Sequence, residues 1–286
     1  MKPMVRVQCI KHIYPDQTQV DLCGLDFVVP EGKRVAVLGG NGTGKTTLLF
    51  HVLGFLSPLE GRVEVMGLKP DQYFHRIRKK IGAIFQNVDE QIIGPRVFDD
   101  IAFSLRSEGW PEKEIEARVL CVARSIGIES ILNKMPHYLS GGQKKKVALA
   151  GAVVLNPQLL ILDEPFESLD PEAKKEIILF LNKLNEKNKL TIITATHDID
   201  VVPQIADLVY VINHGRILTT GSPAEVFAQV EELRLAGLKT PVLSELFKRL
   251  QDRGFRVKIP ENLDEAERQI LRLALLAKEY GCNASC

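Results

Sequence analysis

The sequence predicts an α/β fold in which buried strands alternate with helices around a central sheet. Three short apolar runs, at residues 34–38, 159–162 and 191–195, are typical of strands that are covered on both faces. Segments with the apolar spacing of helices lie between these runs. A glycine-rich stretch directly follows the first run and opens a helix, so a ligand site is expected where that strand ends.

The N-terminal part predicts a strand, a turn and a second strand before the glycine-rich stretch. Residues 5–10 and 25–29 have strand character, and Pro15-Asp16 breaks the chain between them. Apolar residues at helical spacing follow at positions 48–53, and Gly54 is a plausible helix stop.

The middle of the chain predicts two more strands and then a helical region. Residues 62–66 and 81–85 are short apolar runs, whereas residues 87–139 are more polar and have helical character. Within that region a helix is expected to begin at Pro111 and end at Gly127.

The later elements continue the alternation. A helix is predicted over residues 171–184, between the strands at 159–162 and 191–195. Residues 209–212 and 216–219 flank Asn213-His214-Gly215 and predict a hairpin.

The last part of the chain is expected to form a separate unit. A helix should follow Thr240-Pro241, residues 255–259 could form a short strand, and Asn262 with Glu265 resembles a capping box. The apolar stripe of the second helix consists of Ile270, Leu273, Ala274 and Ala277. We therefore predict a main domain over residues 1–235 and a small α/β extension over 236–286. Because about 50 residues is marginal for independent folding, the extension should pack on the body or on another subunit.

Composition excludes several classes of protein. The 286 residues are 45% hydrophobic and 26% charged, with a net charge of +1, so no nucleic-acid partner is expected. No run approaches the ~18 apolar residues that cross a bilayer, and the N-terminus lacks a signal-peptide core.

The five cysteines give no clear disulfide or metal pattern. Cys9, Cys23 and Cys121 lie among apolar neighbours and are interpreted as buried reduced thiols. Cys282 and Cys286 have no nearby histidine, which argues against zinc.

The glycine-rich stretch fits the P-loop pattern, with Gly39, four residues, and then Gly44-Lys45-Thr46. Its glycines let backbone N–H groups turn toward phosphates, and the helix N-terminus adds positive potential. Lys45 should reach the β- and γ-phosphates of ATP, and the Thr46 hydroxyl should ligate Mg²⁺. The alternative is a glycine-rich turn without a ligand. The nucleotide-binding residues predicted in this stretch are Gly39, Asn41, Gly42, Thr43, Gly44, Lys45, Thr46 and Thr47.

A second apolar strand ends in the two carboxylates Asp163 and Glu164. After a P-loop, such an aspartate is the expected second half of the Mg²⁺ site. Glu164 would then polarise the attacking water. The alternative is a solvated acidic turn.

Three single residues are further candidates. Gln86 follows the strand at 81–85 and could contact Mg²⁺ or the water, and His197 could bond the γ-phosphate. Tyr14 could stack on adenine or pack in the core. Taken alone, a histidine or glutamine at the end of a strand is more often structural.

Leu139 and the turn Ser140-Gly141-Gly142-Gln143 resemble the signature of ATP-binding-cassette (ABC) ATPases. The candidate residues follow one another in that family's order: the P-loop, Gln86, the signature, Asp163-Glu164, Asp170 and His197. The resemblance covers about residues 5–227. The resemblance implies a RecA-like core, an antiparallel β subdomain and a helical signature subdomain at about 87–155.

The resemblance also implies a mechanism. Two cassettes face each other head to tail, and Ser140, Gly141, Gly142 and Gln143 of one close over the ATP on the P-loop of the other. Glu164 is then the general base, His197 and Gln86 assist catalysis, and Mg²⁺ is held by Thr46, Gln86 and Asp163. Asp170 would communicate across the dimer, which could be a homodimer or a pair with a paralogue.

A narrower resemblance is to the ATPases of energy-coupling-factor importers, which include the cobalt and nickel importers. It rests on Tyr14-Pro15-Asp16, on residues 85–91, on the lysines after the signature and on residues 196–200. It implies uptake of a transition-metal ion or a vitamin, at the cytoplasmic face of the cell membrane. An integral membrane subunit would dock between Gln86 and Val97, with Asp89 and Glu90 as acidic contacts; these could equally be solvated loop charges.

The sequence departs from the family pattern at two places. Phe166-Glu167-Ser168 replaces the usual threonine and two small residues, and Glu167 adds negative charge near Glu164. Lys146 stands where an arginine is common. Two other functions are considered: a soluble cassette ATPase in translation or DNA repair, and the ATPase subunit of an exporter.

Overall fold

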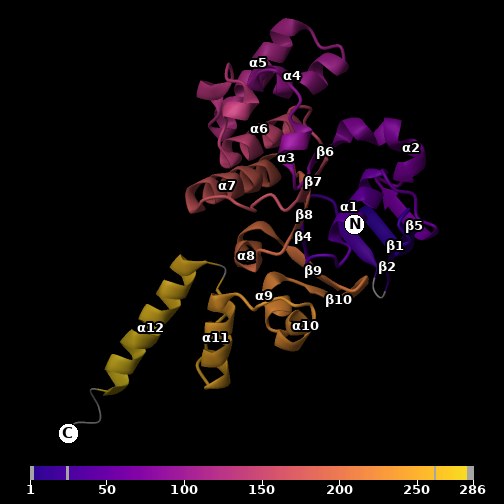
Figure 1. Cartoon of the computed structure of the whole chain (residues 1–286). Helices are drawn as coiled ribbons and strands as arrows, with labels where there is room; N and C mark the ends of the chain where they lie inside the picture. Colours follow the sequence, from indigo (N-terminus) through magenta and orange to yellow (C-terminus); the bar gives the residue numbers. More distant parts are fainter. Residues whose placement is uncertain (1–2, 24–25, 261, 282–286) are drawn as a thin grey trace.

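The computed structural model describes residues 3–23, 26–260 and 262–281 and confirms the α/β class. A six-stranded, mostly parallel sheet forms the centre, and a four-stranded antiparallel sheet lies beside it (Figure 1). The central sheet has the order β10-β9-β4-β8-β7-β6, in which only β10 is antiparallel to its neighbour. Its strands are β4 (Arg34–Leu38), β6 (Ile81–Ile84), β7 (Leu159–Asp163), β8 (Thr191–Thr196), β9 (Leu208–Asn213) and β10 (Arg216–Gly221).

Strand β4 shows why this sheet needs apolar residues on both faces. Ala36 and Leu38 belong to one apolar layer, which also contains side chains of the helices after residue 87. Val35 and Val37 belong to the opposite layer, which is shared with the first helix and the antiparallel sheet. Alternate side chains of a strand point to opposite faces, so a continuous apolar run is required.

The antiparallel sheet is built from the N-terminal part of the chain. Its strands are β1 (Pro3–Ile13), β2 (Gln19–Leu22), β3 (Phe27–Pro30) and β5 (Glu60–Val65). The sequence did not predict β2, a strand of four residues in which Gln19 and Asp21 are exposed and Leu22 is buried.

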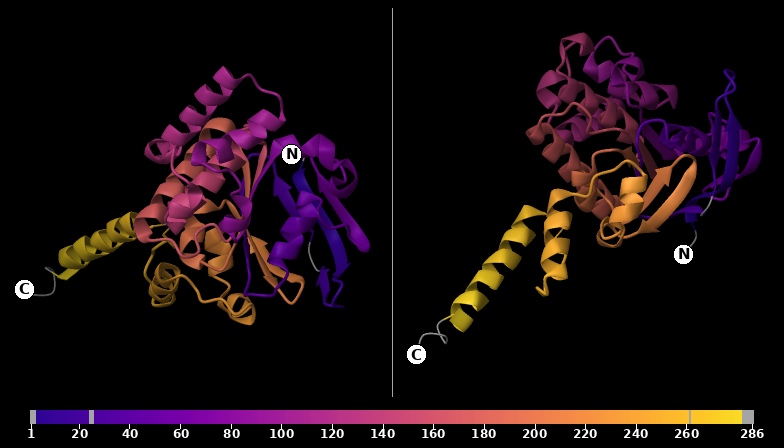
Figure 2. Two further views of the ribbon diagram at one scale, coloured as in Figure 1. Left: turned by 45° about the horizontal axis from the view of Figure 1, so that its top comes forward. Right: turned by 60° about the horizontal axis from the view of Figure 1, so that its bottom comes forward.

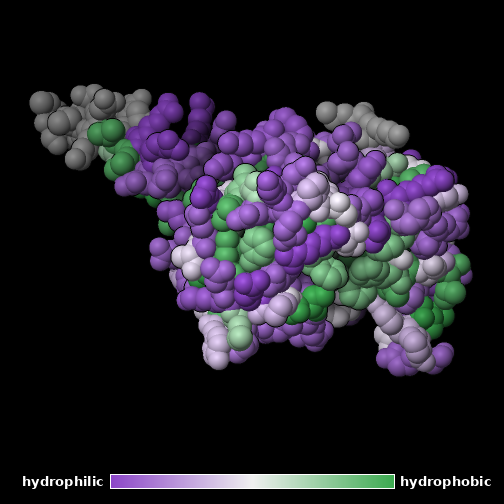
Figure 3. All heavy atoms as spheres, turned by 90° about the horizontal axis from the view of Figure 1, so that it is seen from above, coloured by the Kyte–Doolittle hydropathy of each residue, from purple (hydrophilic) through white to green (hydrophobic). Residues whose placement is uncertain are grey.

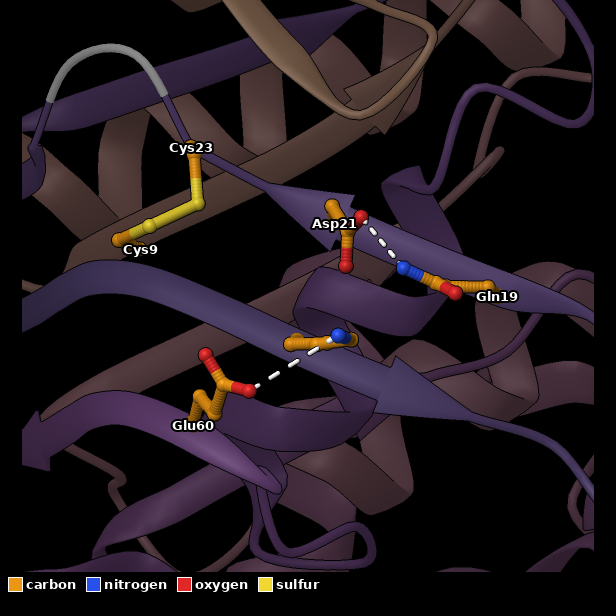
Figure 4. Close-up of a disulfide and its surroundings, with 6 residues drawn as sticks. Cys9, Gln19, Asp21, Cys23 and Glu60 are labelled. Carbon is orange, nitrogen blue, oxygen red and sulfur yellow. Dashed lines mark hydrogen bonds and ion pairs between the residues drawn. A yellow bond between two sulfur atoms is a disulfide. The ribbon is translucent and has the colours of Figure 1, made fainter.

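A disulfide joins Cys9 and Cys23, so the expectation of reduced thiols at these positions is wrong (Figure 4). Strands β1 and β2 pair with Ile10 opposite Leu22. Positions 9 and 23 therefore come next in the antiparallel register, and their Cα atoms are 4.1 Å apart. Cys121 is free, but it is exposed rather than buried.

Helices cover both faces of the central sheet and form a separate lobe above it (Figure 1). The lobe contains α3 (Val88–Gln91), α4 (Val97–Ser107), α5 (Glu112–Ile126) and α6 (Gly141–Val153), within the predicted helical region. The body contains α1 (Lys45–Leu53), α2 (Pro70–Ile77), α7 (Pro171–Asn188), α8 (Val202–Ile205), α9 (Pro223–Phe227) and α10 (Val230–Leu235). Gly54 and Gly127 end α1 and α5 in the left-handed conformation, as predicted.

The C-terminal extension is helical in its described residues, so the α/β character that we expected is wrong. It consists of α11 (Val242–Asp252) and α12 (Leu263–Gly281), and α12 points away from the body in all views (Figures 1 and 2). Residues 255–259 form no strand, because helix side chains bind their backbone. The carbonyl of Val257 accepts from Gln251 Nε2 at 2.8 Å, and the N–H of Lys258 donates to Gln269 Oε1 at 2.8 Å.

The capping residue of α12 agrees with the prediction. Asn262 Oδ1 accepts the backbone N–H of Glu265 at 2.9 Å. Cys282 and Cys286, and the side chain of Ala277, lie outside the described residues. Within the described part of the chain, no helix is long and apolar enough to cross a membrane.

Candidate active site

The predicted site residues come from segments that follow parallel strands of the central sheet. The P-loop follows β4, Asp163 ends β7, and His197 follows β8, so all three lie at the carboxyl edge. They line a cavity of about 450 Å³. Its walls are Tyr14, Thr18, Val20, Asn41, Gly42, Thr43, Gly44, Lys45, Thr46, Thr47, Gln86, Asp163, Glu164, Glu167 and His197.

The P-loop needs glycine at two positions for different reasons. Gly44 has φ +99°, a conformation that side chains rarely adopt, and it caps the N-terminus of α1. Gly39 does not line the cavity, but a Cβ there would lie 2.5 Å from the carbonyl oxygen of Ile212. The loop is thus packed tightly between β9 and α1.

Lys45 is buried beneath the P-loop. Its Nζ donates to the carbonyl oxygens of Gly39 at 2.8 Å and Gly40 at 3.1 Å, and lies 3.6 Å from Glu164 Oε1. These oxygens hold the ammonium group at the position where phosphate oxygens would compete for it.

Two oxygen ligands suited to a hard cation meet at the floor of the cavity. The Thr46 hydroxyl donates to Asp163 Oδ2 at 2.8 Å. Burial raises the pKa of the Asp163 carboxyl above its usual value, and the Thr46 hydrogen bond offsets part of that effect. A divalent cation would favour the ionised carboxylate, so this donor set fits Mg²⁺.

Glu164 is almost completely buried and held on both carboxylate oxygens. Oε2 accepts from the Thr196 hydroxyl at 3.0 Å and the His197 N–H at 3.2 Å. His197 Nδ1 lies 2.9 Å from Oε1. Glu164 follows the last residue of β7 with a left-handed backbone, φ +47°.

Three contacts of the site were not predicted from the sequence. Lys145 Nζ, on α6, donates to the carbonyl oxygens of Glu164 at 3.0 Å and Glu167 at 2.6 Å, and burial lowers the pKa of Lys145. Thr18 and Val20 of the β1–β2 hairpin also line the cavity. Lys145 is the middle residue of the run Lys144-Lys145-Lys146, and nothing in the sequence distinguishes it from its two neighbours.

Gln86 and Tyr14 each have a specific partner at the cavity. Gln86 Nε2 donates to Glu167 Oε2 at 3.0 Å. The hydroxyl oxygens of Tyr14 and Thr47 are 2.9 Å apart. Tyr14 therefore lies beside the P-loop rather than in the core.

The signature residues and Asp170 do not line this cavity. Ser140 caps the N-terminus of α6: its Oγ accepts the N–H of Gln143 at 3.3 Å, and its own N–H donates to Gln143 Oε1 at 3.1 Å. Asp170 caps α7 by accepting the N–H of Ala173 at 2.8 Å. Gly141 is exposed at the start of α6, and Gly142 is half-buried.

A larger cavity of about 620 Å³ borders the first one. The two cavities share Asn41, Glu164, Glu167 and His197, and residues 237–240 form the far wall of the larger one. The site therefore continues into an open region beside the root of the extension.

The fold and the site define an ABC transporter ATPase, and comparison with known proteins agrees. A family model described as "ABC transporter" matches residues 22–167. A shorter model, an AAA domain of a putative AbiEii toxin, matches residues 134–202 within the same fold.

Several relatives share most of the chain. The energy-coupling factor transporter ATP-binding protein EcfA of Methanocaldococcus jannaschii is 45% identical, over 82% of this chain and 85% of that protein. EcfA of Methanothermobacter thermautotrophicus is 38% identical, over 94% and 87%. The structure of CbiO1 from Clostridium perfringens, described as part of the CbiONQ transporter complex, superposes with a TM-score of 0.74 at 38% identity, covering 87% of this chain and all of that one.

The chain belongs to the energy-coupling-factor group of ABC transporter ATP-binding proteins. Its enzymatic activity is ATP hydrolysis coupled to transport.

Proposed function

We propose that the chain powers uptake through a head-to-tail dimer, formed with a second copy or a paralogue, in which each ATP lies between two cassettes. One observation carries this proposal: the signature residues lie on an exposed helix end outside the nucleotide cavity of their own chain. A cassette described as dimeric superposes with a TM-score of 0.70 at 27% identity, which supports the same arrangement.

ATP would bind with its phosphates on the P-loop and its base near Tyr14. Lys45 would exchange the carbonyl oxygens of Gly39 and Gly40 for the β- and γ-phosphates. The backbone N–H groups of residues 41–47 and the N-terminus of α1 would supply the remaining positive potential.

Mg²⁺ would be held by Thr46, Asp163 and Gln86, whose side-chain oxygens suit a hard cation. When bound, the ion neutralises charge on the β- and γ-phosphates.

Hydrolysis would rely on Glu164 as the general base that orients the attacking water. The hydrogen bonds from Thr196 and His197 fix the carboxylate in one position, so it needs no rearrangement to accept a proton. His197 is half-exposed, so its ring could also reach the γ-phosphate from the side of Glu164.

In the dimer, Ser140, Gly141, Gly142 and Gln143 of one chain would close over the ATP held by the other. The N-terminus of α6 presents unpaired N–H groups to the phosphates. Asp170 at the start of α7 would carry communication between the two sites.

The membrane subunit would dock near residues 86–97, in a groove of about 290 Å³ between β6, α4 and α6. Ile93 and Phe103 on its walls are more than half exposed. Figure 3 views the end of the molecule that carries α4 and α5, where hydrophobic residues form separate green patches. Asp89 forms an ion pair with Lys144 at 2.6 Å, which an arginine of the partner could replace.

This docking would place the chain at the cytoplasmic face of the cell membrane, where it would power uptake of a cobalt or nickel ion or a vitamin. The extension would contribute to the dimer, since Leu263, Leu271 and Leu275 of α12 are more than half exposed.

A pull-down of the tagged full chain from detergent-solubilised native membranes tests this function. We expect recovery of a polytopic membrane subunit and a small membrane substrate-capture protein, identified by mass spectrometry. Phe103→Asp should abolish this recovery, whereas Leu179→Asp, at an exposed position on α7, should not. Recovery of ribosomal or DNA-repair components without a membrane subunit would contradict the proposal.

A further inference from the structure

Glu167 is the acidic residue that the family pattern does not explain, and its backbone is held firmly. Its carbonyl oxygen accepts from Lys145 Nζ at 2.6 Å, and its N–H donates to the carbonyl of Glu164 at 3.3 Å. Ser168, the next residue, has φ +59° and turns the chain sharply. These constraints fix the direction from which the exposed side chain of Glu167 reaches the cavity.

The side chain of Glu167 contacts Gln86, which lies 81 positions earlier in the chain. Gln86 Nε2 donates to Glu167 Oε2 at 3.0 Å. An ionised carboxylate can only accept hydrogen bonds, so it selects the amide nitrogen of Gln86 and turns the amide oxygen to the opposite side. Without such a partner, the two ends of a glutamine amide are free to exchange places.

The orientation of Gln86 matters because only one end of its amide can bind a metal ion. Mg²⁺ and Mn²⁺ take oxygen ligands, whereas an amide N–H₂ group is a donor and does not ligate. Both Gln86 and Glu167 line the nucleotide cavity, together with Thr46 and Asp163.

We propose that Glu167 is a positioning residue that orients the Gln86 amide so that its oxygen is available to the divalent cation. The inference rests on the proposed function of Gln86 as a metal ligand. In this role Glu167 acts through Gln86 and is not itself a ligand of the cation. Because Gln86 is the first residue of the proposed docking region, its hydrogen bond to Glu167 also joins the turn after Asp163 and Glu164 to that region.

Binding of Mn²⁺ to the full-length protein, in the presence of a non-hydrolysable ATP analogue, tests the proposal. Electron paramagnetic resonance measures the free Mn²⁺ and therefore reports affinity without turnover. Glu167→Ala should weaken Mn²⁺ binding about three- to tenfold, the range that one hydrogen bond contributes. Glu167→Gln presents both an acceptor oxygen and a donor N–H₂ group, so it no longer excludes the reversed Gln86 amide, and its Mn²⁺ affinity should lie between those of the parent protein and Glu167→Ala. Glu172→Ala, an exposed carboxylate on α7, is the matched control and should have no effect.

A double-mutant cycle with Gln86→Ala separates orientation from general electrostatics. If Glu167 acts through Gln86, Glu167→Ala should weaken Mn²⁺ binding by less than about twofold in the Gln86→Ala background. An equal loss of Mn²⁺ affinity in both backgrounds would show that charge alone matters and would overturn the proposal.

The same cycle distinguishes failure of this inference from failure of the proposed function. If Gln86→Ala weakens Mn²⁺ binding but Glu167→Ala does not, Glu167 has no positioning role and the metal site stands. If Gln86→Ala leaves Mn²⁺ binding unchanged, Gln86 is no metal ligand, and both assignments are wrong.

Discussion

The residues of the nucleotide cavity contact one another within a single chain, whereas the residues of the signature segment lie outside that cavity. Lys45, Asp163 and Glu164 are each less than a tenth exposed and already contact one another or their supporting residues. Ser140 and Gly141 are exposed, and among the described residues the side chain of Ser140 bonds only within its own helix cap. The nucleotide cavity is thus assembled from residues of one chain. The signature segment instead presents a helix N-terminus to the outside, which suits a phosphate held by another molecule.

The largest expected effect is on the rate of ATP hydrolysis, when Glu164 in the nucleotide cavity is replaced. Glu164→Gln should lower the rate of ATP hydrolysis about 10²- to 10⁴-fold, because the general base is lost. ATP affinity should change little, since a glutamine oxygen can still accept from Thr196 and His197. Phosphate release and nucleotide titration measure the two quantities, with Glu172→Gln as the control. Turnover within tenfold of the parent protein would remove Glu164 from the mechanism.

The helix beneath the P-loop also carries an acid-sensitive group. Burial, and to a lesser degree the neighbouring His12, lowers the pKa of His51 to about 4. In the unfolded chain a histidine titrates near 6.5, so between pH 6.5 and 4 the unfolded state binds a proton that the folded state does not.

The free energy of unfolding should therefore fall as the pH drops through this window, by up to about 3 kcal/mol from His51. Urea denaturation at several pH values measures it. His51→Gln should flatten this part of the profile relative to the parent protein, whatever its absolute stability. An unchanged slope would show that His51 takes up its proton in the folded state, near the usual pKa.

A somewhat smaller free-energy change than that of His51 is expected for ATP binding when Lys45 is replaced. Lys45→Ala should weaken ATP binding roughly 10- to 100-fold, which corresponds to about 1.5–3 kcal/mol for a charged hydrogen-bonding partner. Equilibrium binding of a fluorescent ATP analogue measures this loss. Lys187→Ala, at an exposed position on α7, should bind normally. Unchanged affinity in Lys45→Ala would argue against the P-loop assignment.

The smallest expected effect is on the stability of the signature segment, when Ser140 is replaced. Ser140→Ala removes the cap of α6 and should lower the free energy of unfolding by about 1 kcal/mol. In dilute, monomeric protein ATP affinity should stay the same, because Ser140 does not line the cavity. At a protein concentration high enough for dimers to form, the rate of ATP hydrolysis by Ser140→Ala should still fall. Weaker ATP binding by the monomer would mean that Ser140 acts within its own chain.

Much of the fold could be predicted because its signals are local. The buried strands, the P-loop between β4 and α1, and the glycine that ends α5 each depend on neighbouring residues. For the same reason, every predicted residue of the P-loop except Gly39 lines one cavity.

What the sequence could not predict depends on register or on distant partners. The Cys9–Cys23 disulfide follows from the pairing of β1 with β2, a strand too short and too exposed to be recognised. Residues 255–259 have strand composition, but side chains of α11 and α12 take up their backbone hydrogen bonds. The contacts of Lys145 and of Gln86 with the turn after β7 join segments that only the folded sheet brings together.

The most direct test of the central claim is whether ATP joins two cassettes through the signature. Light scattering measures the mass of the Glu164→Gln protein in solution, and one chain is close to 31.9 kDa. We expect Mg-ATP to lower the dissociation constant of its dimer about tenfold or more. Adding Ser140→Arg should abolish that tightening while leaving ATP bound. A Glu164→Gln protein that binds Mg-ATP without any change in its dimer dissociation constant would contradict the account.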